Sequence, residues 1–152
     1  MTIDPGKATA LVFDPLTVRA DRGRLALFAR TIGETDPVYT DLHAAQQAGH
    51  RDLLIPPTFY FSLELEAPDP FGYLTEIGID LRTILHGEQS FTYHSLAHAG
   101  DTLTLRPRIS EVYSKKGGAL EFLVKRTDIT RDRDLVAEAT SVLVVRHPEA
   151  AK

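Results

Sequence analysis

The sequence predicts a single α+β domain in which an antiparallel β-sheet wraps around a central apolar helix. The chain has 152 residues, the size of one domain, so we expect residues 1–152 to fold as one unit. Apolar residues follow a helical period in the first half and a period of two after about residue 85. Between these halves, residues 58–77 leave little polar face, as expected of a buried helix.

The composition excludes several classes of protein. Acidic residues number 21 against 17 Lys and Arg, with no basic block, so we expect no nucleic-acid partner. The chain has no cysteine, which excludes disulfides, thiolate nucleophiles and sulfur-bound zinc and suits a reducing compartment. The start of the chain lacks a signal-peptide pattern, and no apolar run reaches the roughly 18 residues of a membrane span. We therefore expect a cytoplasmic protein that does not enter membranes.

The first half of the chain predicts short helices. Residues 1–19 are expected to form an arm or one short strand, because two prolines interrupt any helix there. Apolar residues at helical spacing predict a helix from Asp21, a candidate N-cap, to Gly33. After a proline-containing turn, Asp41 is expected to cap a helix over residues 42–48.

Pro56 and Pro57 introduce the apolar segment. Aromatic and leucine residues then follow almost without interruption until Pro68 and Pro70 break or kink the helix, which resumes for a turn or two before Gly78.

The second half predicts three or four long antiparallel strands. Alternation is visible in three segments and a valine-rich run, residues 135–145, is typical of a central strand. In one of the segments Leu120, Phe122 and Val124 alternate with Glu121, Leu123 and Lys125. Gly117-Gly118 indicates a hairpin between two strands.

A sheet of this kind must cover its apolar face, and residues 58–77 are the only strongly apolar partner. Wrapping the sheet around that helix produces the hotdog fold. One edge strand would remain unpaired, which favours extension of the sheet by a second subunit. We therefore expect a dimer.

Three ordered segments carry a family resemblance. Phosphate-loop, zinc-protease and serine-hydrolase motifs are absent from the sequence. The segments are F-A-R-T-I-G-E-T-D-P-V-Y-T-D-L-H-A-A from Phe28, L-L-I-P-P-T-F, and H-G-E-Q-S-F-T-Y-H-S-L-A-H-A-G-D-T-L. From about Thr17 to Val145 the chain resembles the MaoC-like dehydratases and (R)-specific enoyl-CoA hydratases, in particular the subgroup related to the N-terminal half of the fatty-acid-synthase dehydratase.

This resemblance implies a hotdog protomer that acts on acyl thioesters of coenzyme A or acyl carrier protein. Active members reversibly hydrate a trans-2-enoyl thioester to the (R)-3-hydroxyacyl thioester, with neither a metal nor a redox cofactor. Coenzyme A or the carrier protein would thus be part of the substrate.

The chain departs from the family's catalytic motif, G-D-x-N-P-x-H. Gly33 and Pro37 match it, whereas Glu34 replaces the aspartate, Asp36 the asparagine and Tyr39 the histidine. Hydration requires one group to accept a proton and another to donate one. Histidine, with a pKa of about 6.5, exchanges protons near neutrality, but tyrosine at about 10 does not without strong tuning.

Some family members are heterodimers in which one subunit has lost the catalytic pair and widens the acyl channel. The resemblance therefore favours a substrate-shaping partner of a catalytic MaoC-like subunit. Three alternatives stay open: a homodimeric hydratase that uses Glu34 with a nearby histidine, an acyl-CoA thioesterase, and a non-catalytic acyl-thioester binding module.

The candidate catalytic residues are Glu34, Tyr39 and His86. His86 and Gly87 stand at a predicted loop-to-strand junction that could line the cleft, and His43 lies about one helical turn beyond Tyr39. The candidate substrate-binding residues are Asp36, Pro57, Thr58, Phe59 and Gly87. Because proline lacks an N–H, Thr58 and Phe59 would have to supply any backbone donors for a thioester oxygen.

Overall fold

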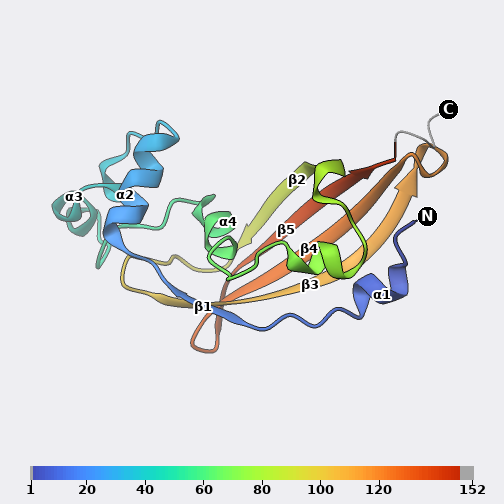
Figure 1. The fold of residues 1–152 in the computed structure, drawn as a ribbon. Coiled ribbons are helices and arrows are strands. Elements are labelled where there is room, and N and C mark those ends of the chain that lie inside the picture. Colours follow the sequence, from blue (N-terminus) through green and yellow to red (C-terminus); the bar gives the residue numbers. More distant parts are fainter. Residues whose placement is uncertain (1, 148–152) are drawn as a thin grey trace.

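The computed structural model describes residues 2–147 and contains one five-stranded antiparallel sheet flanked by short helices (Figure 1). Its strands follow the order β1-β3-β4-β5-β2, so β1 and β2 form the two edges. The bounds are β1 (Leu16–Arg19), β2 (Ile84–Tyr93), β3 (Thr102–Lys115), β4 (Leu120–Arg131) and β5 (Asp134–Arg146). The predicted hotdog fold class is confirmed, and the valine-rich run is an interior strand.

Five short α-helices precede or interrupt the strands. They are α1 (Pro5–Thr9), α2 (Arg22–Thr31), α3 (Leu42–Gln47), α4 (Phe59–Glu64) and α5 (Gly72–Glu76), with 3-10 turns η1 (Pro37–Tyr39), η2 (Leu81–Thr83) and η3 (Lys116–Gly118). The predicted helices over residues 21–33 and 42–48 are confirmed as α2 and α3. Asp41 caps α3 by accepting the N–H of Ala44 at 2.9 Å, whereas Asp21 stands at the start of α2 without a side-chain capping bond.

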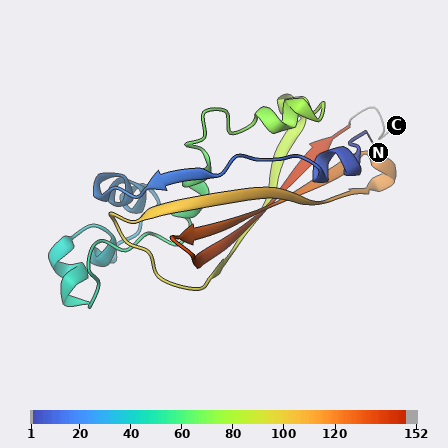
Figure 2. The same ribbon diagram turned by 90° about the horizontal axis from the view of Figure 1, so that it is seen from below.

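The helix α1 corrects the prediction that prolines exclude a helix from the first residues. Pro5 occupies the first turn, where a missing N–H costs nothing, and Asp4 caps the turn by accepting the N–H groups of Gly6 and Lys7. The N-terminal segment then runs alongside β3 in both views, which places α1 at the opposite end of the sheet from α2 and α3 (Figures 1 and 2).

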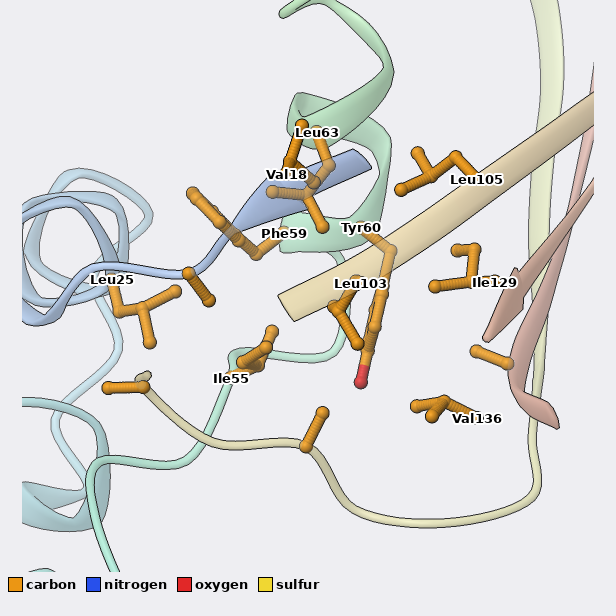
Figure 3. Close-up of a cluster of buried hydrophobic side chains, with 14 of the residues drawn as sticks. Val18, Leu25, Ile55, Phe59, Tyr60, Leu63, Leu103, Leu105, Ile129 and Val136 are labelled. Atoms are coloured by element: carbon orange, nitrogen blue, oxygen red, sulfur yellow. The ribbon is translucent and has the colours of Figure 1, made fainter. Parts of the chain in front are cut away.

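The apolar segment of residues 58–77 forms two helices with separate cores, interrupted around Pro68 and Pro70 as predicted. Ala67 precedes Pro68, a position that disfavours helical backbone, so α4 ends at Glu64 after six residues. The side chains of Phe59, Tyr60 and Leu63 pack with residues of β1, β3, β4 and β5 in the cluster of Figure 3. Leu74 of α5 packs in a second cluster with Ile109, Leu123 and Val145.

The helices cover one face of β4, and it is not the face with more apolar side chains. Glu121 and Leu123 are fully buried and Lys125 is largely buried, whereas Phe122 stacks on Tyr113 with ring centroids 4.7 Å apart. Two ionisable residues therefore lie on the side of the strand that faces the helices.

The predicted hairpin after β3 is confirmed, with Gly117 and Gly118 both at positive φ.

Candidate active site

The loop of residues 33–39 follows α2, ends with η1 and carries three predicted site residues. Gly33, at a φ of 77°, ends the helix in a conformation that glycine adopts without strain. The N–H of Glu34 then folds back to donate to the carbonyl of Ala29 at 2.9 Å. This fold-back sets the direction in which the loop leaves the helix.

Both carboxylates of the loop bind backbone groups of the loop itself. Glu34 Oε1 accepts the N–H groups of Thr35 and Asp36 at 2.8 and 2.9 Å, and Asp36 Oδ1 accepts the N–H of Val38 at 3.0 Å. These bonds hold the turn that precedes η1. The structure therefore places Glu34 and Asp36 as turn-forming groups whose bound oxygens are directed at the backbone.

Tyr39 is half-buried at the end of η1, beside a cavity of about 370 Å³. Pro57, Tyr60 and Tyr93 line the same cavity. Burial raises the pKa of the Tyr39 hydroxyl, and the negative charges of Glu34 and Asp36 raise it further. The hydroxyl therefore stays protonated at neutral pH, so it can donate a hydrogen bond but cannot accept a proton as histidine would.

Tyr93, at the end of β2, is a site residue that the sequence did not identify. Its hydroxyl donates to the carbonyl of Pro57 at 2.7 Å and so ties the edge strand to the segment that precedes α4. Burial and the neighbouring Tyr39 raise its pKa. In the sequence Tyr93 is one of several alternating residues, and nothing in that pattern marks the hydrogen bond.

Residues 57–59, where α4 begins, include two that line cavities and one that packs in the core. Thr58 is exposed at a second cavity of about 450 Å³, whereas Phe59 is buried with its ring edge-on to Phe28 at 5.1 Å. The N–H of Phe59 already donates to the carbonyl of Pro56 at 3.0 Å. With α4 only six residues long, this geometry gives little support to a backbone site for a thioester oxygen.

His86 and Gly87 form a β-bulge near the start of β2. The pairing of β2 with β5 shifts between His86 and Glu88, and His86 Nε2 lies 3.0 Å from the carbonyl oxygen of Glu88. A carbonyl only accepts, so this nitrogen carries the hydrogen. The ring also lies 5.2 Å from that of Phe61 at the wall of the second cavity.

The predicted catalytic residues do not converge on one point within the chain. Tyr39 shares a cavity with Tyr93, but His86 lies seven residues earlier on β2, about 23 Å of extended strand. His43 is exposed on α3. The chain thus holds a row of cavities along α4 and β2, and the polar groups identified along these cavities are bound mainly to backbone.

Gly87→Ala is expected to lower the free energy of unfolding by about 1–3 kcal/mol, because an overpacked site forces its surroundings to move. A Cβ at Gly87 would lie 2.7 Å from Val144 Cγ2 and 3.1 Å from the carbonyl oxygen of Val142. Urea unfolding followed by circular dichroism measures the change. Gly23→Ala in α2 is the matched control: it meets no atom within 4 Å, and should be neutral or stabilising. Equal stability of both variants would contradict the bulge geometry.

Residues 2–147 contain no helix that is both long and apolar enough to cross a membrane. In the same range no three His, Cys, Asp or Glu side chains are grouped as metal ligands would be.

Comparison with known sequences gives one family and a set of close relatives. Residues 7–139 match the model of the FAS1-like, dehydratase domain region. A UPF0336 protein of Streptomyces griseus is 35% identical over 131 residues, 86% of each chain. A UPF0336 protein of Parafrankia is 39% identical over 129 residues, 82% of each chain.

Solved structures share the fold. A chain of the C-terminally truncated HadBC (3R-hydroxyacyl-ACP dehydratase) complex from Mycobacterium tuberculosis superposes with a TM-score of 0.76 and 26% identity, over 88% of this chain and 93% of that one. A chain of the ChsH1-ChsH2 complex from the same organism also reaches 0.76, at 19% identity, over 94% and 88% of the two chains.

Proposed function

The chain belongs to the family of FAS1-like dehydratase domain regions, and on that premise we propose that it is the substrate-shaping subunit of an enoyl-thioester hydratase or (3R)-hydroxyacyl-thioester dehydratase. Its substrate would be an acyl thioester of coenzyme A or acyl carrier protein. A MaoC-like partner with the complete aspartate and histidine pair would carry out the proton transfers.

The protonation state of the Tyr39 hydroxyl is the observation that carries this proposal. Hydration needs a group that takes a proton from water near neutral pH. Tyr39 stands where the family's histidine is expected, and its raised pKa keeps it protonated. Glu34 is the remaining candidate base of the motif, and its Oε1 is bound to two N–H groups of its own loop.

An exposed sheet edge supports a partner subunit. The edge strand β2 carries Leu85 and Tyr93, each 47% exposed, and lines the cavities beside α4. Unpaired strand edges offer N–H and C=O groups to another strand. The two similar structures described above are both complexes, HadBC and ChsH1-ChsH2, which favours a heterodimer for this chain.

Reconstitution with a candidate MaoC-like partner tests the proposal. Hydration of a short trans-2-enoyl-CoA is followed for the chain alone, the partner alone and the mixture. We expect the chain alone to be inactive and the mixture to convert substrates that the partner alone converts slowly. Hydration by the chain alone would favour the homodimeric hydratase, and release of free thiol would favour the thioesterase.

Glu34→Gln and Tyr39→Phe, each in the reconstituted pair, are expected to change kcat by less than about threefold, whereas loss of a general acid or base costs about 10²–10⁴-fold. The amide introduced by Glu34→Gln would retain an oxygen that accepts the loop N–H groups, so the turn should persist. The matched control is replacement of the partner's motif histidine, which should abolish turnover. A hundredfold loss in either variant of this chain would assign the chemistry to it.

A further inference from the structure

A buried ion pair lies beyond the far end of the row of cavities, away from the 33–39 loop. Lys125 Nζ in β4 is 2.5 Å from Glu64 Oε2 at the end of α4, and the two side chains are 13% and 8% exposed. Both residues line two cavities of about 400 and 210 Å³. The pair is therefore a wall that the two cavities share.

One oxygen of the carboxylate in this pair has no partner. Both oxygens of Glu64 are shielded from solvent; Oε2 meets the Lys125 ammonium, and Oε1 has no partner among residues 2–147. A buried charge in this state costs free energy unless a donor reaches it, and an unsatisfied buried group in a native protein calls for an explanation. The free oxygen, Oε1, therefore favours an occupant that donates a hydrogen bond.

The surroundings of the pair are apolar and aromatic. Lys125 Nζ lies 5.5 Å from the ring centroid of Tyr73, and Phe61, Phe71 and Leu143 line the smaller cavity. Burial, and then the charge of Glu64, raises the pKa of Tyr73, so its hydroxyl remains neutral. The ion pair has no net charge, and a charged occupant would lack a counter-charge here. An occupant that fits is thus neutral, mostly apolar, and able to donate and accept.

The smaller cavity adjoins the proposed substrate path. It shares Phe61 and His86 with the 450 Å³ cavity, which in turn shares Tyr93 with the cavity beside Tyr39. An apolar chain that enters beside Tyr39 and follows α4 would reach Glu64 and Lys125 last.

We propose that Glu64 and Lys125 form a recognition site for a hydroxyl group on the acyl tail of the substrate. The hydroxyl would donate to Glu64 Oε1 and accept an N–H of Lys125. A ketone or an ether offers no donor, and a plain methyl end would leave the carboxylate oxygen unsatisfied. This inference rests on the proposed function, because it assumes that an acyl chain occupies the cavities.

Matched ligands test the proposal on the full chain, alone and with its partner. Saturated acyl-CoA thioesters from butyryl to decanoyl are compared with their terminally hydroxylated counterparts by isothermal titration calorimetry. At the chain length that reaches the pair, we expect the hydroxylated ligand to bind about tenfold more tightly, the size of one hydrogen bond to a charged group. Glu64→Leu with Lys125→Met keeps the volume and should reverse this preference.

The possible outcomes distinguish failure of the hydroxyl site from failure of the proposed function. If both series bind with equal affinity at every length, the hydroxyl site is overturned while the proposed function stands. If the double variant keeps the preference for hydroxylated ligands, the site is also overturned. If no thioester of either series binds the chain or the pair, the acyl-binding function itself is wrong.

Discussion

Lys125→Met is expected to lower the free energy of unfolding by about 3–5 kcal/mol at pH 7, because removing one partner of a buried ion pair leaves a buried charge uncompensated. Glu64 is 8% exposed and has no other bonding partner among residues 2–147, so the loss of the Lys125 ammonium leaves its charge without support. Denaturant unfolding with a fitted m-value measures the change.

The control is the double variant Glu64→Leu with Lys125→Met. Apolar replacement of a whole buried pair is often neutral or stabilising, so the double variant should recover most of the stability lost in the single one. A loss of less than about 1 kcal/mol, the range of exposed pairs, would contradict the burial of this pair.

Asp101→Asn is expected to lower the free energy of unfolding by about 2–3 kcal/mol, the upper range for a hydrogen bond to a charged group. The buried Asp101 carboxylate accepts bonds from Arg51, from Arg131 at 2.9 Å and from the N–H of His98 at 2.9 Å. It thereby joins the chain after α3, the turn before β3 and the β4–β5 hairpin. The backbone bond from Ala99 N to Leu53 O, 2.8 Å, lies in the same region.

The pH dependence of this loss has a definite sign. Burial alone would raise the pKa of Asp101, but the hydrogen bonds from Arg51, His98 and Arg131 outweigh it and hold the pKa below its ordinary value. Such a carboxylate stabilises the fold above its unfolded pKa, about 3.9, and this contribution is lost as pH falls through the lower folded value. The wild type and the variant should therefore converge in stability below about pH 4.

Asp128→Asn is the matched control. Asp128 pairs with Arg108 at 2.9 Å across β3 and β4, but both side chains are substantially exposed. An exposed pair contributes at most about 1 kcal/mol, so the control should change little. Equal losses at Asp101 and Asp128 would contradict the role of burial.

Local patterns predicted most of the elements. The α2 and α3 helices, the Gly117-Gly118 hairpin and the interior strand β5 follow from spacing, capping and turn chemistry, which depend on residues close together in the chain. The α1 helix was not predicted, because Pro5 resembles a helix breaker. Proline is nevertheless acceptable in the first turn of a helix, where Pro5 lies.

The site was predicted only in part. Residues 33–39 were found because the family motif is contiguous, and the structure places Tyr39 at a cavity. Tyr93 was missed because its bond to the Pro57 carbonyl joins residues 36 apart in the chain. The placement of Phe59 in the core, and not at a cavity, also depends on a distant partner, Phe28.

By itself the sequence determined the fold class, the order of the elements after α1 and the departure from the catalytic motif, because all three can be read from neighbouring residues. Only the tertiary structure decided that Glu121 and Lys125 lie on the covered face of β4 and that Lys125 meets Glu64. Alternation shows which residues share a face of a strand, but which face is covered depends on the helices that pack there.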